Sequence, residues 1–165
     1  MDQRKPIGQG VVEFALVIPI LLLIVFGTFE LARAVWIYSA ISTAVREAAR
    51  YGSTIGESED GPPHYIDCEG MRALAKDFGA PGNVQDEDVL ISYDRGPGTA
   101  TIGECPVSQA SIQLGDRIIV EVTGRFVPIP YLPLVQIPPI TFTSEVHRTI
   151  VKALILDSIP ITSTP

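Results

Sequence analysis

The longest apolar stretch lies near the start of the chain. Residues 7–29 contain Glu13 as their one ionisable side chain. As a helix that rises about 1.5 Å per residue, a segment of this length spans about 34 Å, enough to cross the hydrocarbon core of a bilayer. The pattern therefore predicts one transmembrane helix.

Beyond the apolar stretch, a helix with one apolar and one polar face is predicted to continue to Tyr51, with Gly52 ending it. The apolar face consists of Ile41, Ala44, Val45 and Ala48. The polar face consists of Ser42, Thr43, Arg46, Glu47 and Arg50. The alanine-rich face allows close approach, so either the chain's own sheet or a helix of another subunit is expected to cover it.

Two pairs of opposite charge on this helix have the three-residue spacing that lets side chains meet, Glu30 with Arg33 and Glu47 with Arg50. As exposed pairs they would each contribute only a few tenths of a kcal/mol. Together with Arg46 they are interpreted as the polar residues of an interface helix, with a structural role.

Downstream, Asp67 is predicted to cap a second helix, which ends near Gly79. Its apolar stripe consists of Cys68, Met71, Leu74, Ala75 and Phe78. Residues 89–93, 118–127 and 140–150 read as strands, the last two with alternating apolar and polar residues. Residues 94–116 read as a long glycine-rich loop. The expected fold class is α+β, with a small antiparallel sheet.

Charge is distributed unevenly along the chain. The net charge of −7 falls entirely on residues 30–165, because the charges of residues 1–29 sum to zero. An acidic domain without basic clusters is not expected to bind nucleic acid. Arg4 and Lys5 precede the apolar stretch, which predicts a cytoplasmic N-terminus and an extracytoplasmic C-terminal part in a single-pass membrane protein.

The chain has two cysteines, Cys68 and Cys105, both on the C-terminal side of the apolar stretch. Outside the cytoplasm they would form one disulfide, which stabilises the fold by about 4 kcal/mol in the chain-entropy model. Two buried thiols are the alternative.

The string GQGVVEFALVIP resembles the prepilin-peptidase signal of type IV pilins and pseudopilins, with Gly8 ending a short basic leader and Glu13 and Phe14 opening the apolar run. Cleavage after Gly8 would free the amine of Gln9, with which the Glu13 carboxylate, or that of a neighbouring subunit, could pair. An uncleaved signal anchor is the first alternative. The Ala32–Arg33–Ala34 pattern offers signal-peptidase cleavage as a second, although the apolar run is too long for an ordinary signal peptide.

Residues 8–53 resemble the TadE-like family of the tight-adherence (Flp) pilus system. The features that carry the resemblance are the Gly–Glu–Phe signal, Pro19 within the apolar run, Gly27, Glu30 and Arg33 at its end, and the segment REAARYGS. The resemblance implies a pilin-like pseudopilin, a substrate of a prepilin peptidase that meets other pilin-like subunits and an assembly platform. The expected division is a leader (1–8), a transmembrane helix (9–29), its extension (30–52) and an extracytoplasmic domain (53–165).

The proline-rich stretch 127–139 cannot join a central strand. It is interpreted either as a crossover over the sheet edge or as an adhesive surface for the membrane or a pilus subunit. No nucleophile motif, phosphate loop or metal-ligand spacing is evident, so neither an enzyme nor a cofactor or metal is expected. Glu57, Glu59 and Asp60 lack the spacing of a calcium loop. A tethered binding module is the second hypothesis for function.

Overall fold

The computed structural model describes residues 7–58, 61–129 and 138–151. Its helices are α1 (Ile7–Ser53) and α2 (Cys68–Gly79), and short 3-10 turns lie at His64–Ile66, Ala80–Gly82, Asp86–Asp88 and Gln109–Ser111. Its strands are β1 (Val89–Asp94), β2 (Thr101–Glu104), β3 (Arg117–Phe126) and β4 (Ile140–Thr149). The predicted α+β class, with one long and one short helix and an antiparallel sheet, is confirmed.

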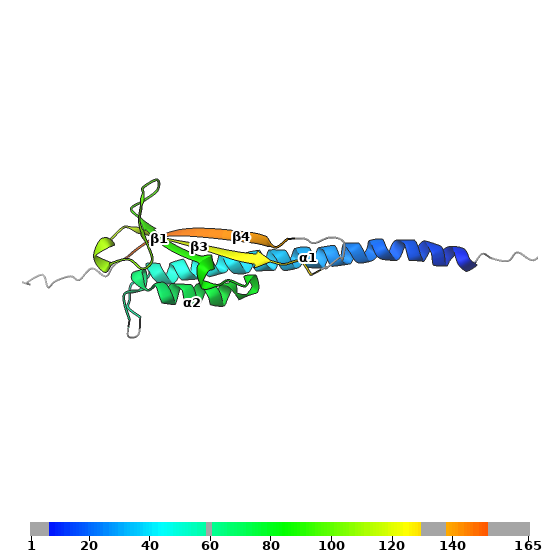
Figure 1. Ribbon diagram of the computed structural model, residues 1–165, viewed down its shortest axis with the longest axis horizontal. Helices are drawn as coiled ribbons and strands as arrows, with labels where there is room; N and C mark the ends of the chain where they lie inside the picture. The colour runs from blue at the N-terminus through cyan, green and yellow to red at the C-terminus, as the bar shows by residue number, and fades with distance from the viewer. Residues whose placement is uncertain (1–6, 59–60, 130–137, 152–165) are drawn as a thin grey trace, which may run out of the picture.

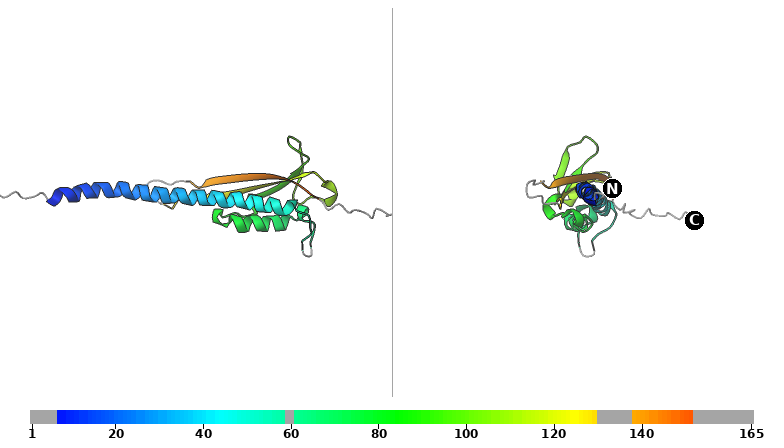
Figure 2. Two further views of the ribbon diagram at one scale, coloured as in Figure 1. Left: turned by 180° about the vertical axis from the view of Figure 1, so that it is seen from behind. Right: turned by 90° about the vertical axis from the view of Figure 1, so that its right-hand side faces the viewer.

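One helix runs through the whole molecule. The first half of α1 projects alone, whereas its second half lies between the sheet on one side and α2 on another (Figure 1). Two further views show the same arrangement from behind and end-on (Figure 2). The strands follow the order β2-β1-β3-β4, and every neighbouring pair is antiparallel. Of the two covers expected for the alanine-rich face, the structure shows the chain's own sheet, and α2 covers the face as well.

The core forms where the predicted periodic patterns meet. α1 contributes its apolar face, and β3 contributes every second residue from Ile118 to Phe126, as the two-residue period of a strand requires. Met71 and Ala75 of α2 are fully buried. Asp67 caps α2 as predicted, because its Oδ1 accepts a hydrogen bond from the Gly70 N–H at 2.9 Å.

Three details of the sequence-based prediction are wrong. Residues 101–104 form strand β2, paired with β1, inside the segment expected to be a loop. Ser42 was expected on the polar face but is buried, because α1 is covered on two sides and a wider arc of it is enclosed. Phe78 was expected in the core but is exposed. Glu59, Asp60 and most of the proline-rich stretch lie outside the described residues.

Two ion pairs join β3 to β1 and to the 3-10 turn that precedes β1. The Arg117 Nε lies 2.7 Å from Asp94 Oδ1, and the Arg125 Nη2 lies 2.7 Å from Asp88 Oδ1. The Arg117 guanidinium holds the pKa of the Asp94 carboxyl below its usual range, although burial opposes this shift. Sequence patterns do not show either pair, because the partners lie 23 and 37 positions apart in the chain, on different elements.

A glycine in β3 allows α1 to approach the sheet closely. A Cβ added at Gly124 would lie 2.8 Å from Ile41 Cγ1 and closer still to its Cδ1. Both residues belong to the buried interior, so neither has room to move away. The contact therefore requires a residue without a side chain at position 124.

Gly124→Val is expected to lower the free energy of unfolding by about 1–3 kcal/mol, because it forces overlap with Ile41 in a close-packed core. The measurement is chemical unfolding of the full chain in detergent micelles, followed by near-ultraviolet circular dichroism. Adding Ile41→Ala should relieve the overlap. The free energy of unfolding of the double variant should therefore fall by less than the sum of the decreases in the two single variants. Gly103→Ala on β2, where the added Cβ meets one Val107 methyl at 3.1 Å, is the control.

Candidate functional site

The N-terminal half of α1 is apolar on all sides and is not covered by the rest of the described chain. Its large apolar residues from Val11 to Phe29 are exposed except Ile18, which is intermediate. A helix that is apolar all round needs either a protein interior or a membrane. Among the described residues, α1 is the one helix that is long and apolar enough to cross a membrane. This is consistent with a single-pass membrane anchor.

The residues of the expected processing signal all lie on α1. An added Cβ at Gly8 or Gly10 would meet nothing within 4 Å. Glu13 is exposed and makes no hydrogen bond or ion pair with any residue that the structure describes. Gln9 precedes it by four residues, about 6 Å along the axis, so the two positions share one face of the helix.

Phe14 and Pro19 continue this segment toward the domain. Phe14 is exposed, and α1 passes through Pro19 without a break. Because proline lacks an N–H, the carbonyl of Ala15 loses its usual donor at this point. Exposed apolar side chains, a proline and a carboxylate that has no partner among the described residues thus occupy one helical segment.

At the junction between the free helix and the domain, Glu30 and Arg33 do more than form the predicted pair. Their carboxylate and guanidinium lie 3.2 Å apart, and the side chains are only 17% and 22% exposed, so their expected exposed placement is wrong. Arg33 also donates to the carbonyl of Val127 and lies 4.6 Å from the centre of the Phe126 ring. The Ile129 N–H lies 3.5 Å from Glu30 Oε2. The pair therefore fastens the end of β3 to α1.

The other predicted interface residues lie near the far end of α1. Glu47 and Arg50 form the predicted pair, with Arg50 Nη2 2.6 Å from Glu47 Oε2, and the Arg50 side chain is 64% exposed. Arg46 is also exposed and lines a different feature, a pocket between α1 and β4.

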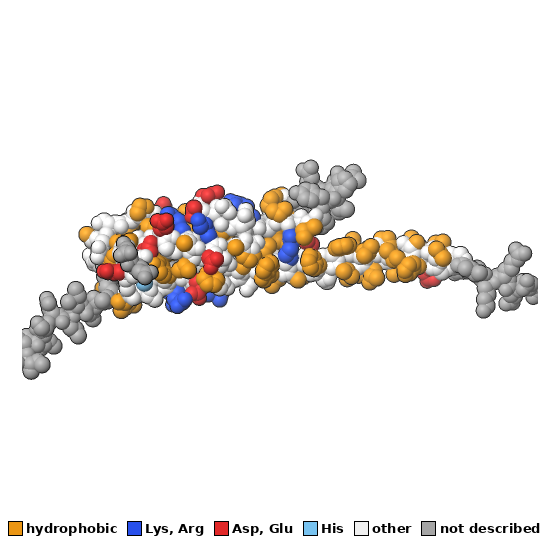
Figure 3. Space-filling model, turned by 90° about the horizontal axis from the view of Figure 1, so that it is seen from below, with side chains coloured by type: hydrophobic (Ala, Val, Ile, Leu, Met, Phe, Trp, Pro, Cys, Tyr) orange, Lys and Arg blue, Asp and Glu red, His pale blue; other side chains and the backbone are white. Residues whose placement is uncertain are grey.

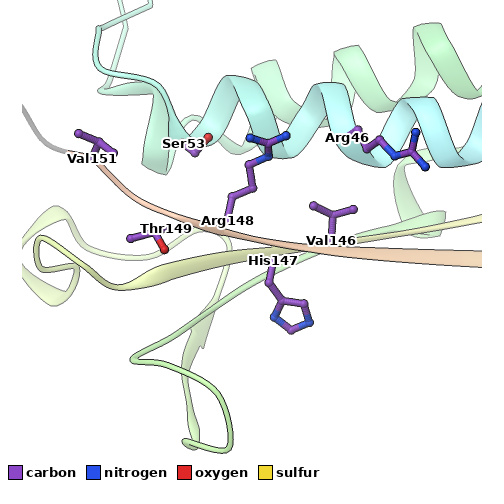
Figure 4. Close-up of a pocket in the computed structure, with 7 residues that line it drawn as sticks. All are labelled: Arg46, Ser53, Val146, His147, Arg148, Thr149 and Val151. Carbon is purple, nitrogen blue, oxygen red and sulfur yellow. The ribbon is translucent and has the colours of Figure 1, made fainter.

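This pocket has a volume of about 590 Å³ and a cationic lining. Arg46 and Ser53 from α1 and Arg148 from β4 border it, whereas His147 points to the other face of the sheet (Figure 4). The His147 Nε2 lies there 2.8 Å from Glu145 Oε1. The lining offers positive charge and hydroxyl groups but no carboxylate or thiol, so its chemistry suits an anionic group.

The predicted disulfide between Cys68 and Cys105 is confirmed, with 5.9 Å between the two Cα atoms. It ties the start of α2 to the segment after β2. The Tyr93 hydroxyl lies beside it, 3.3 Å from Cys105 Sγ and 2.7 Å from the Tyr65 carbonyl oxygen, and burial raises the pKa of this hydroxyl.

Asp67, next to Cys68, holds three groups together. Besides capping α2, its Oδ2 accepts hydrogen bonds from the hydroxyls of Tyr51 at 2.6 Å and Ser58 at 3.2 Å. Burial alone would raise the pKa of Asp67, but the hydrogen bonds from Tyr51, Gly70 and Ser58 outweigh it and lower the pKa. The end of α1 is thereby joined to the disulfide-linked start of α2.

Comparison with known proteins gives one match, and it falls on the free helix and its extension into the domain. No curated protein and no solved structure matches the chain. The family model described as "TadE-like protein" matches residues 8–50, which lie within α1. The resemblance to the TadE-like family is thus confirmed by a family match over residues 8–50.

Proposed function

We propose that this protein is a TadE-like pseudopilin, a minor pilin that takes part in assembling an adhesive tight-adherence pilus or its secretion apparatus. A prepilin peptidase removes the leader after Gly8, and α1 then holds the protein in the membrane with its domain outside the cytoplasm. Its partners are other pilin-like subunits and the assembly platform. Its role is structural and not enzymatic.

The observation that carries this proposal is that the family match and the exposed apolar segment fall on the same helix, α1. The family match begins at Gly8 and extends through the helix, and the same helix leaves about 20 residues apolar, free and uncovered. A span of about 20 apolar residues is what a bilayer crossing requires. In this proposal one helix both crosses the membrane and forms part of the domain core. The membrane span therefore fixes where the domain lies relative to the bilayer, as an assembling subunit requires.

The test is the N-terminal residue and intact mass of the protein purified from membranes of cells with and without the matching prepilin peptidase. The proposal predicts a start at Gln9 only when the peptidase is present. A start at Met1 in both cells would leave an uncleaved anchor, and a start at Val35 would indicate a secreted domain.

Glu13→Leu is expected to abolish pilus assembly while the protein still inserts in the membrane. Removing the carboxylate eliminates a desolvation cost of about 2–3 kcal/mol at mid-bilayer, and less near its surface, so insertion should not suffer. What is lost is the partner of the Gln9 amine on the same or a neighbouring subunit. The measurements are membrane fractionation and counts of surface pili.

Glu57→Leu removes an exposed carboxylate outside the apolar segment and serves as the control, with assembly expected to be normal. Normal piliation in the Glu13→Leu strain would contradict the assembly role.

The cationic pocket favours one other candidate function, a membrane-anchored binding module that captures an anionic ligand beside Arg46 and Arg148. In that case the chain remains uncleaved, and any unrelated transmembrane helix in place of residues 9–29 preserves function. The pseudopilin proposal requires the opposite result in both measurements.

A further inference from the structure

The uncovered apolar surface of α1 does not stop where the predicted membrane span ends. Between Glu13 and Arg46 the charged residues are Glu30 and Arg33, which pair with each other. From Glu30 onward the helix exposes Leu31, Val35 and Trp36, each between 59% and 65%. Leu31 and Trp36 are five residues apart, so these exposed residues span about 140° of the circumference of α1.

The domain presents a second exposed apolar group at the same position along the α1 axis. It consists of Val127 and Ile129, which follow the C-terminal end of β3, and Ile140, which begins β4. These residues are between 46% and 58% exposed. Their height is fixed by the junction, since Arg33 donates to the Val127 carbonyl and Glu30 lies beside the Ile129 N–H. Figure 3 shows apolar side chains along the free helix and again where it enters the domain.

The described residues at this end of the domain, 126–129 and 138–144, include no Asp, Glu, Lys or Arg, although the domain as a whole is acidic. Exposed apolar groups are normally scattered over a soluble surface, and a contiguous group marks an interaction site. Here the group is continuous with the apolar span.

We propose that the base of the domain lies in the headgroup layer of the membrane, where the exposed apolar residues of α1 beyond the span, together with Val127, Ile129 and Ile140, contact lipid. The inference rests on the proposed membrane anchoring of α1. Trp36 lies about 10 Å beyond Phe29 along the axis. A tilt of the helix shortens the distance between Trp36 and the hydrocarbon edge, measured along the membrane normal, and so brings Trp36 near the headgroup layer. Tryptophan and tyrosine favour this layer, and Trp36 and Tyr38 both lie there, exposed.

A lipid surface explains these features better than a protein partner. The exposed apolar surface of α1 continues from the proposed span into this region and lies beside the apolar end of the sheet, and one lipid layer would cover both groups. The two charges at this depth pair with each other and hydrogen-bond to the backbone of residues 127 and 129, although the buried Arg33 Nε has no partner among the described residues. This is how charged side chains are tolerated near hydrocarbon.

The first test uses Trp36, the one tryptophan of the chain. The full chain is reconstituted in phosphatidylcholine liposomes that contain lipids brominated either near the headgroup or deep in the acyl chains. The proposal predicts blue-shifted emission and stronger quenching by the shallow bromines. Water-like emission without quenching would overturn it, and so would blue-shifted emission without quenching, which would mean that another copy covers Trp36.

The second test examines the sheet end. In a Trp36→Phe background, Ile129→Trp is expected to be quenched by brominated lipid and protected from iodide in the water. Leu114→Trp, at a residue about equally exposed (55% against 58%) but at the opposite end of β3, should show the reverse and is the matched control. Equal behaviour of the two variants would overturn contact between the sheet end and lipid.

Extraction at alkaline pH separates this inference from the proposal on which it rests. Protein that stays in the membrane pellet but shows no lipid quenching at either position would retain the anchor and refute the docked base. Protein released to the supernatant would refute the anchor itself.

Discussion

Gly8→Arg is expected to leave the chain at full length in membranes that contain the prepilin peptidase, whereas the unaltered chain begins at Gln9. The physical reason is steric: a peptidase that accepts glycine at the cut site needs close approach to the backbone, and a long cationic side chain prevents it. Because an added Cβ at Gly8 meets nothing within 4 Å, the fold itself is unaffected. Intact mass and N-terminal sequencing measure the outcome.

Gly10→Ala provides the control, since position 10 is equally open and lies on the mature side of the expected cut. This variant should be processed normally and should insert normally. A Gly8→Arg chain that still begins at Gln9 would show that cleavage does not depend on Gly8.

Removal of the disulfide is expected to produce the largest loss of stability. The bridge joins residues 37 positions apart, and closing a loop of that length in the unfolded chain corresponds to about 4 kcal/mol in the chain-entropy model. The variant with both Cys68→Ser and Cys105→Ser should therefore unfold at a much lower denaturant concentration. Guanidinium unfolding of the full chain in micelles, followed by near-ultraviolet circular dichroism, measures the difference.

Reduction supplies an internal control for this result. A thiol reductant should shift the unaltered chain to the midpoint of the double variant and should leave the double variant unchanged. Equal midpoints for the oxidised chain and the double variant would mean that the bridge does not stabilise the domain.

The sequence predicts those elements whose pattern repeats over many residues. The long helix, the cap at Asp67 and the alternating strand β3 all follow from local periodicity or from a single side chain near its own backbone. Strand β2 does not, because four residues that include Gly103 are too few to display a period, and their pairing with β1 is set by the rest of the sheet. Ser42 was misplaced because periodicity does not show that α1 is covered from two sides.

In the candidate site, too, contacts within one helix follow from the sequence, whereas contacts between distant segments do not. The spacing of Glu30 and Arg33 predicts their ion pair, since both residues lie on one helix. Their contacts with Val127 and Ile129 cross more than 90 positions in the chain, and no local signal connects such distant residues. The two sheet ion pairs were missed for the same reason. The sequence therefore predicts the long apolar helix, but not how the domain is attached to it.

Because α1 is continuous, a change in the orientation of its free segment moves the domain with it. The same helix that forms the free apolar segment continues to Ser53 as the central element of the core, without a linker between them. About 35 Å of it extends beyond Glu30. A tilt of about 20°, common for membrane helices, therefore carries the far end of the domain sideways by about 12 Å. In a chain anchored as proposed, a force that acts on the free segment of α1 is transmitted through this one helix to the outer end of the domain, and a force on the domain is transmitted back in the same way.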